Sequence, residues 1–294
     1  MHFREFCNFP IVLLGVAENC IDISIAVCVG EIHITKLLTL DVTSGFLASD
    51  NTVRLARIFK ALSYCRKDLT CYYDEIGQGT TPKLSSLFPK PTPMDPSIVL
   101  PILTYKQFLP RAGQPASALV DLGKTKTALY IATLDGADEE VVVKFTPRYN
   151  AKAHNILASA GFAPKLHFCG RVVGGLYMVV MDRVDGKSLW QLQTDKIPIP
   201  TIVLEHVRQA VHLIHEQNIV LGDLQDPNIL YVASKTCAVV VDFDWPGVDG
   251  VDRYPATLNP TNDWQEDVSP YGIMRKAHDV WQLERLEDLC QHGA

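Results

Sequence analysis

Alternating apolar and polar residues near the start of the chain predict β-strands. Two such runs, at 21–27 and 32–38, are separated by Gly30 and Glu31, which suit the turn of a hairpin. The apolar run at 9–17 resembles the core of a signal peptide, but no small-residue cleavage site follows it. We therefore expect a core strand there as well.

The following segment repeats apolar residues at helical spacing and predicts an amphipathic helix. Asp50 or Asn51 can provide its N-terminal cap. The expected apolar face of this helix consists of Leu55, Ile58, Phe59, Leu62, Cys65 and Leu69. From Gly77 to Pro101, proline, glycine, serine and threonine are frequent, which predicts a linker.

Short strands separated by turn residues, among them Gly123 and Gly136, are expected after the linker. One helix is predicted at 151–160, ending before Gly161, because glycine readily adopts the left-handed conformation that terminates helices. The predicted strands are 118–121, 128–134, 140–145, 166–171 and 176–181. Five strands and one helix would form a small mixed lobe.

The remainder of the chain is predicted to be mostly helical. A helix at 201–217 would bury the face formed by Val203, Leu204, Val207, Ala210, Val211 and Ile214. We divide the chain into an N-terminal α+β accessory segment (1–78), a proline-rich linker (79–101), a β-rich lobe (102–184) and a helical lobe (185–294).

The composition is that of a globular protein, with 47% apolar and 20% charged residues. A net charge of −6 argues against an extended surface for nucleic acid or anionic membranes. No apolar run approaches the ~20 residues that span a bilayer. The eight cysteines form no close C-x-x-C pair and suit a reducing compartment. We expect a soluble, intracellular protein, cytoplasmic or nuclear, without nucleic-acid or membrane partners.

Three segments carry side chains that suit chemistry on phosphates. Lys144 ends an apolar strand, Asp223 and Asn228 lie five residues apart in a loop, and Asp242 follows the apolar run 238–241. Taken singly, Lys144 could be an edge residue whose amine reaches solvent, and Asp242 could form a turn. Together they provide a cation for phosphates, oxygens for magnesium and a carboxylate for an acceptor hydroxyl, which are the parts that phosphoryl transfer needs.

The combination resembles the protein-kinase signature of strand lysine, catalytic loop and D-F-G segment. The Gly-Asp-Leu sequence around Asp223 and the Asp-Phe-Asp-Trp sequence from Asp242 resemble in particular divergent kinase-like proteins of fungi and the aminoglycoside and choline kinases. The resemblance covers about residues 100–290. It implies an α+β, bilobal protein-kinase-like fold, with a small β-rich lobe and a larger, mostly helical lobe truncated after the helix of Asp279, preceded by an extra α+β segment.

The resemblance also implies roles for these side chains. Lys144 would bind the α- and β-phosphates of ATP, and Asp223 would accept or orient the acceptor hydroxyl. Asn228 and Asp242 would hold Mg²⁺ between the phosphates.

Further positions follow from the same resemblance. Met181 would line the adenine pocket, and the backbone of Asp182 and Val184 would bind the adenine edge. The turn at Gly123 would cover the phosphates. Asp279 would brace the catalytic loop from a later helix, or would instead cap that helix.

The chain departs from the kinase pattern at several positions. Leu221 replaces the usual histidine, so an apolar contact would replace a bracing hydrogen bond, and Gln225 replaces a common lysine or arginine. No G-x-G-x-x-G sequence occurs. Residues 145–181 contain no Asp or Glu, and Lys152 occupies the aligned position of the helix glutamate that orients the strand lysine. Either Lys152 points outward, or the active conformation differs, or catalysis has decayed.

Two functions are therefore open. One is an ATP- and magnesium-dependent phosphotransferase acting on a protein or small-molecule hydroxyl. The other is a pseudokinase that binds nucleotide or a protein partner without turnover. The first 78 residues are interpreted as a docking or regulatory segment.

Overall fold

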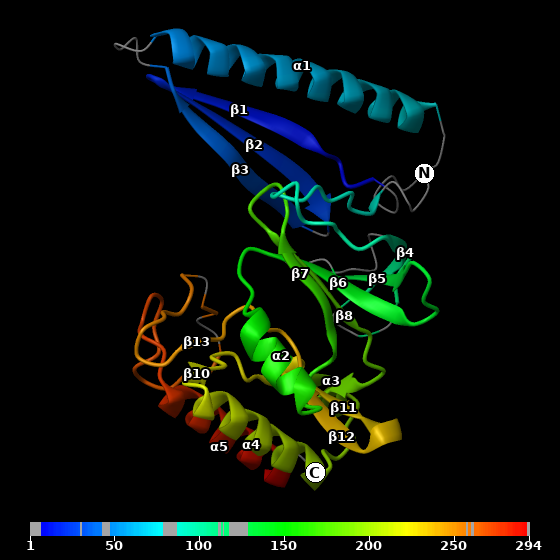
Figure 1. The fold of residues 1–294 in the computed structure, drawn as a ribbon, viewed down its shortest axis with the longest axis vertical. Helices are drawn as coiled ribbons and strands as arrows, with labels where there is room; N and C mark the ends of the chain where they lie inside the picture. Colours follow the sequence, from blue (N-terminus) through cyan, green and yellow to red (C-terminus); the bar gives the residue numbers. More distant parts are fainter. Residues whose placement is uncertain are drawn as a thin grey trace. The chain divides into compact units, whose positions relative to one another are not determined.

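The computed structural model describes residues 7–29, 31–42, 48–78, 87–110, 113, 115–117, 129–256, 258–259 and 262–292. The chain divides into two compact units, shown in Figure 1. One comprises Met1–Lys90 with Gln107–Ala128, and the other comprises Pro91–Lys106 with Leu129–Ala294. The four segments expected from the sequence remain a prediction. Among the described helices, none has both the length and the apolar character needed to cross a membrane.

The first unit contains a three-stranded antiparallel sheet of β1 (Ile11–Ala17), β2 (Cys20–Val29) and β3 (Glu31–Asp41), in that order. The predicted hairpin is confirmed, because Val29 pairs with Glu31 next to the turn. The run at 9–17 forms a strand, but the expectation of a core strand is wrong. Most β1 side chains are exposed, and Val16 is 75% exposed.

The helix of the first unit, α1 (Ala48–Gly77), is confirmed but begins before both predicted caps. Its partly buried side chains recur at helical spacing as predicted. Tyr73, near the end of the helix, is also partly buried, and its hydroxyl donates a hydrogen bond to the carbonyl of Pro10. Phe59 was predicted on this face but is exposed. The partly buried predicted residues are Leu55, Ile58, Leu62, Cys65 and Leu69.

The second unit contains a five-stranded sheet, whose strand order is β4-β5-β6-β8-β7. The strands are β4 (Leu103–Phe108), β5 (Leu129–Leu134), β6 (Glu140–Thr146), β7 (Leu166–Arg171) and β8 (Tyr177–Asp182). The predicted strand 118–121 lies outside the described residues. The sequence analysis missed β4, a short strand that directly follows the proline-rich segment. Residues 92–94 of that segment pair with the end of β7, since Met94 N–H donates to the carbonyl of Arg171.

The helix α2 (Ala151–Ser159) follows β6 and confirms the prediction. The side chain of Asn150 accepts a hydrogen bond from Ala153 N–H and so caps the helix. The chain leaves the helix through Gly161, whose φ of +82° lies in the left-handed region as expected.

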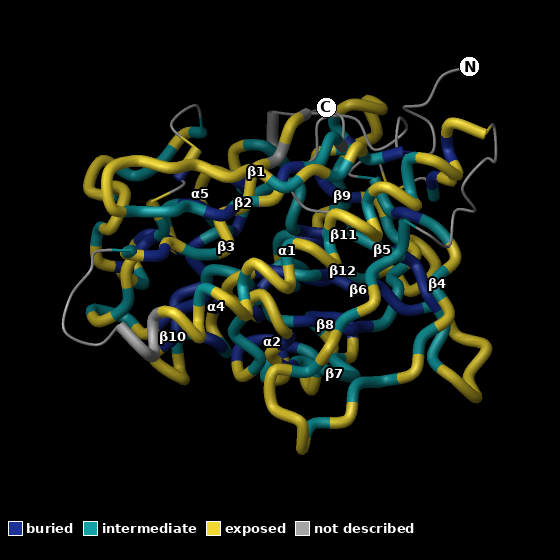
Figure 2. The backbone as a smooth tube through the Cα atoms, turned by 90° about the horizontal axis from the view of Figure 1, so that it is seen from above, coloured by how far each residue is buried: buried dark blue, intermediate teal, exposed yellow. Residues whose placement is uncertain are grey.

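The remaining part of the second unit combines helices with short strands. The helices are α3 (Leu189–Thr194), α4 (Thr201–Glu216) and α5 (Lys276–His292). The short strands are β9 (Lys187–Ser188), β10 (Ile219–Val220), β11 (Ile229–Val232), β12 (Cys237–Val240) and β13 (Gly247–Val248). The predicted apolar face of α4 packs with α2 and β12 in one core cluster. Many residues of β6, β8 and this cluster are buried, and Figure 2 shows buried residues in dark blue.

Candidate active site

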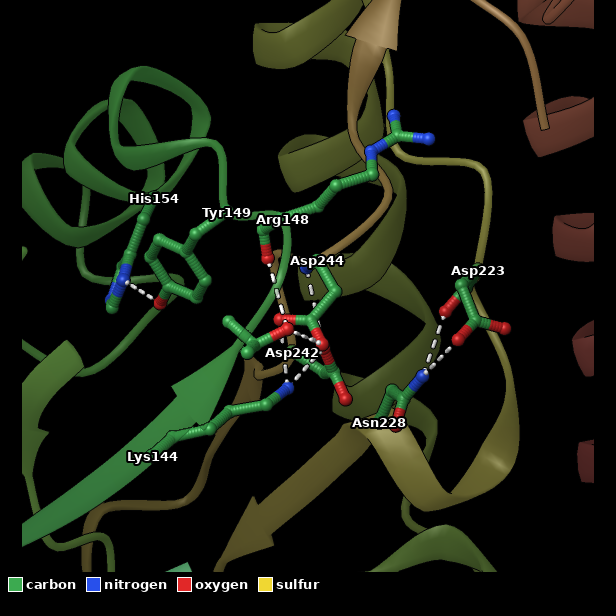
Figure 3. A network of polar contacts seen from close by, with 9 residues as sticks. Lys144, Arg148, Tyr149, His154, Asp223, Asn228, Asp242 and Asp244 are labelled. Atoms are coloured by element: carbon green, nitrogen blue, oxygen red, sulfur yellow. Dashed lines mark hydrogen bonds and ion pairs between the residues drawn. The ribbon is translucent and has the colours of Figure 1, made fainter. Parts of the chain in front are cut away.

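Lys144 is buried in the central strand β6, where it lies opposite Leu129 of β5 and Val179 of β8. Its Nζ lies 2.7 Å from Oδ1 of Asp242 and 2.8 Å from Oδ1 of Asp244. Burial alone would lower the pKa of Lys144, but the two carboxylates outweigh this effect and raise it. Lys144 is therefore a charged group held between two acids (Figure 3).

Both acids come from the Asp-Phe-Asp segment that follows β12. Asp242 has a φ of +71°, a left-handed conformation that is strained for a residue with a side chain. The Thr146 hydroxyl donates to Oδ2 of Asp244 at 2.7 Å. Thr146 and Lys144 are two residues apart on β6, so they project from the same face of the strand. Burial first, and then the charge of Asp242, raise the pKa of Asp244 to about 6.

Asp223 and Asn228 form the other half of the site (Figure 3). The Asn228 amide donates to the backbone carbonyl and to Oδ2 of Asp223, both at 3.0 Å. A backbone hydrogen bond of 2.8 Å from Val241 N–H to the carbonyl of Asn228 joins this loop to the residue before Asp242. Burial first, and then the charge of Asp242, raise the pKa of Asp223 to about 7.

The helix α5 holds the backbone of the loop at 221–228, the predicted catalytic loop, with two side chains one turn apart. The carboxylate of Asp279, which is fully buried, accepts from Leu221 N–H at 2.7 Å and from Gly222 N–H at 2.8 Å. Oε1 of Gln282 accepts from Leu224 N–H at 3.0 Å. Of the two roles expected for Asp279, bracing of the loop is thus confirmed.

The absence of a loop histidine is compensated from elsewhere. Leu221 lies in the apolar core cluster, as predicted. Nε2 of His215, in the last turn of α4, lies 2.9 Å from Oδ2 of Asp279 and supplies a histidine contact from a different element. Gln225, where a cation was expected, accepts from the Asn262 amide at 2.8 Å.

The α2 helix does not bring Lys152 toward the site. Lys152 is exposed, so the outward orientation considered from the sequence is the one observed. The inward residue is His154, whose ring stacks on Phe243 with a centroid distance of 4.5 Å. Its Nε2–H donates to the carbonyl of Pro164, and its Nδ1 accepts from the Tyr149 hydroxyl. This pattern fixes the neutral tautomer.

The residues predicted to bind adenine lie at the end of β8. Met181 is buried, while Asp182 and Val184 are partly buried. Because Asp182 N–H already donates to the carbonyl of Lys165, Asp182 would offer its carbonyl to a ligand. Gly123 lies outside the described residues.

The structure brings Lys144, Asp223, Asn228 and Asp242 together, whereas sequence reasoning missed Asp244, Thr146 and His154. Asp244 could have been identified because it is the second acid of the Asp-Phe-Asp sequence. The period of two along β6 would also have placed Thr146 beside Lys144.

Comparisons with known proteins find similarity among solved structures. No model of a protein family matches the chain. No curated protein matches it either. Among solved structures, it is similar to the kinase PK-1 of Cydia pomonella granulovirus, with 16% identity and a TM-score of 0.48 over 64% of this chain and 67% of that one. This likeness carries no information on function.

The α+β, protein-kinase-like fold predicted from the sequence is confirmed by the arrangement of the chain itself. A five-stranded sheet with the helix α2 precedes a part that contains α4 and α5. Lys144, the loop of Asp223 and Asn228 and the Asp-Phe-Asp segment follow one another in the chain order of the kinase signature and lie together.

The charges of the site suit a divalent cation. Two carboxyl groups, those of Asp242 and Asp244, contact the one ammonium group. Repulsion among these acids and Asp223 contributes to the raised pKa values of Asp223 and Asp244. Within the described residues, no cluster of three His, Cys, Asp or Glu side chains forms a metal site. Magnesium, however, uses one or two carboxylates together with phosphate oxygens and water, which fits Asp242 and the side-chain oxygen of Asn228.

Proposed function

We propose that this chain is an ATP- and Mg²⁺-dependent phosphotransferase, which transfers the γ-phosphoryl group to a hydroxyl of a protein or a small molecule. The observation that carries the proposal is the convergence of side chains from three distant segments. Lys144 contacts Asp242 at 2.7 Å, and Asn228 contacts Asp223 at 3.0 Å in the loop bonded to residue 241.

Each of these side chains has a chemical task in the proposal. Lys144 binds phosphate oxygens, and Asp242 with Asn228 holds the cation, which neutralises charge on the phosphates. Asp223 orients the acceptor hydroxyl and accepts its proton. A carboxyl with a pKa near 7 is suited to that exchange.

The remaining contacts bind the substrates. An adenine edge offers both a donor and an acceptor, which the carbonyl of Asp182 and the N–H of Val184 would satisfy beside Met181. The resemblance to fungal kinase-like proteins and to aminoglycoside and choline kinases supports a hydroxyl acceptor but leaves both classes of acceptor in the proposal.

A pseudokinase is the second candidate, and one observation favours it. Gln225 stands where a cation would stabilise the transferred group, and its side chain is held by Asn262. A chain that binds nucleotide but lacks this cation would use its site for binding alone.

The proposal is tested with γ-labelled ATP and Mg²⁺ on the full chain, with water and a mixture of protein and small-molecule hydroxyls as acceptors. We expect Asp223→Asn to lower turnover by about 100-fold or more, since a positioned base contributes at least that much. Nucleotide affinity, measured by calorimetry, should change little in this variant. Asp242→Asn should instead abolish the Mg²⁺ dependence of nucleotide binding.

The matched control is Asp135→Asn, which removes an exposed acid from the turn after β5 and should leave both measurements unchanged. Nucleotide binding without turnover in the unaltered protein would support the pseudokinase. No binding of ATP or ADP at all would refute the phosphotransferase and leave the pseudokinase only as a protein-interaction module.

A further inference from the structure

Lys144 has a second carboxylate partner that the kinase signature does not assign. We propose that Asp244 is the positioning residue for Lys144, in the role that an acid on the helix after the lysine strand would otherwise fill. This inference rests on the proposed function and names a further residue of the same site. It starts from the 2.8 Å contact between Lys144 Nζ and Asp244 Oδ1.

The two acids that contact Lys144 differ in how they are held. The side chain of Asp244 is 21% exposed and that of Asp242 is 36% exposed. Each oxygen of Asp244 has its own partner on β6, Lys144 for Oδ1 and the Thr146 hydroxyl for Oδ2. Asp242 is the acid that a cation would engage. When it does so, Asp244 remains as the carboxylate that keeps the Lys144 amine aimed at the phosphates.

The α2 helix has no part in this charge contact. Between residues 145 and 181 the sequence contains neither Asp nor Glu. Instead, α2 is docked on the Asp-Phe-Asp segment through neutral contacts. Asn150 N–H donates to the carbonyl of Phe243 at 2.8 Å, its side-chain amide donates to that of Pro246 at 2.9 Å, and His154 stacks on Phe243.

Charge pairing and helix docking are therefore separate in this chain. In the usual arrangement one ion pair performs both tasks, so that a displaced helix also releases the lysine. Here Lys144 keeps a carboxylate from the Asp-Phe-Asp segment whatever charge α2 carries. A charge change on α2 should consequently have no effect on nucleotide binding.

The test measures ATP affinity of the full chain by calorimetry, once in EDTA and once across a Mg²⁺ titration. At saturating Mg²⁺, where the cation would engage Asp242, Asp244→Asn should weaken ATP binding about tenfold, as should Lys144→Met. The double variant should bind no more weakly than either single variant, because both remove the same contact. Asp244→Glu should bind ATP more tightly than Asp244→Asn, because it keeps a carboxylate at this position. In both Asp244 variants, the Mg²⁺ concentration for half-saturation should stay as in the unaltered protein.

Three results would overturn the inference. They are an unchanged ATP affinity of Asp244→Asn at saturating Mg²⁺, fully additive losses in the double variant, or a rise in half-saturating Mg²⁺ like that of Asp242→Asn, which would make Asp244 a metal ligand. The matched control, Lys152→Glu, reverses a charge on α2 and should leave affinity unchanged. If Asp244→Asn does not fold, Thr146→Val decides, since it frees one oxygen of Asp244 and should weaken ATP binding at saturating Mg²⁺ about threefold.

Failure of the proposed function would look different. If the unaltered protein binds no ATP, the midpoints of urea unfolding of the same four proteins decide the inference. Non-additive midpoints would show that Lys144 and Asp244 are coupled, and additive midpoints would refute the pairing.

Discussion

In the catalytic-loop half of the candidate site, side chains hold backbone N–H groups, whereas in the strand half they hold one another by charge. Asp279 and Gln282 accept three backbone hydrogen bonds from residues 221–224. In the strand half, Lys144 lies between the carboxylates of Asp242 and Asp244. A backbone donor has a fixed direction, but an ammonium group can exchange one oxygen partner for another.

This difference assigns different tasks to the two halves. The backbone of the loop half is held without a ligand, because Asp279 and Gln282 already accept hydrogen bonds from its N–H groups. In the strand half, phosphates and a cation would compete for Lys144 and for its acids. Substitutions of the side chains that brace the loop should therefore reduce stability, whereas substitutions of Lys144 and its two acids should mainly change binding.

The largest effect is expected from Asp279→Ala. It leaves the buried N–H groups of Leu221 and Gly222 unpaired and removes the partner of His215. Loss of a buried, hydrogen-bonded acid of this kind costs about 4 kcal/mol of unfolding free energy, measured by urea denaturation. Glu284→Ala removes an exposed acid from the same helix and should change it by less than about 0.5 kcal/mol. Equal effects of the two variants would show that α5 does not brace the loop.

A smaller effect is expected from Gly222→Ala. Gly222 has a φ of +77°, and a Cβ would lie 2.3 Å from Cε of Met274. The left-handed backbone and the displaced methionine should together cost about 2 to 3 kcal/mol in urea denaturation.

The control for this variant separates the two causes. Gly136 has a similar φ of +75°, but nothing lies within 4 Å of its added Cβ. Gly136→Ala should cost about 1 kcal/mol, from the backbone conformation alone. If both variants lost the same stability, close packing around the catalytic loop would not contribute.

In both halves of the site, the sequence predicted the residues better than the contacts that they make. Asp223, Asn228 and Asp242 were predictable because short motifs fix their spacing, and Lys144 because a charged residue in an apolar strand is unusual. The helix α4 and the sheet from β5 to β8 were predictable from periodicity and turn residues. The contacts of Asp279 were open, since a lone acid early in a helix is equally suited to capping.

Contacts between distant segments could not be predicted from local patterns. His215 replaces the loop histidine from another element, and Asp244 replaces an acid expected on α2. In both cases a similar contact is made by a residue from another segment of the chain. The spacing of residues within one segment does not reveal such a contact. β1 was misjudged for a related reason, because an apolar sequence establishes strand propensity but not what covers the strand.

The smallest effect concerns the docking of α2 in the strand half and depends on pH. Burial lowers the pKa of His154, and the hydrogen bond to the carbonyl of Pro164 only partly opposes this. The unfolded chain therefore binds a proton at His154 more readily than the folded chain does. The stability contributed by this neutral ring is fully present above the unfolded pKa of about 6.5 and is lost as pH falls below it.

When the pH is lowered from 7 to 5.5, the unfolding free energy should thus decrease more in the unaltered protein than in His154→Gln. The two decreases should differ by up to about 1 kcal/mol. The comparison uses this difference because Asp223 and Asp244, whose pKa values are raised, take up protons in the folded state and act in the opposite direction. His212→Gln, at an exposed position of α4, should keep the slope of the unaltered protein. If His154→Gln left the slope of unfolding free energy against pH unchanged, the ring stacked on Phe243 would be protonated as readily in the folded chain as in the unfolded one. The docking of α2 would then not depend on a neutral histidine.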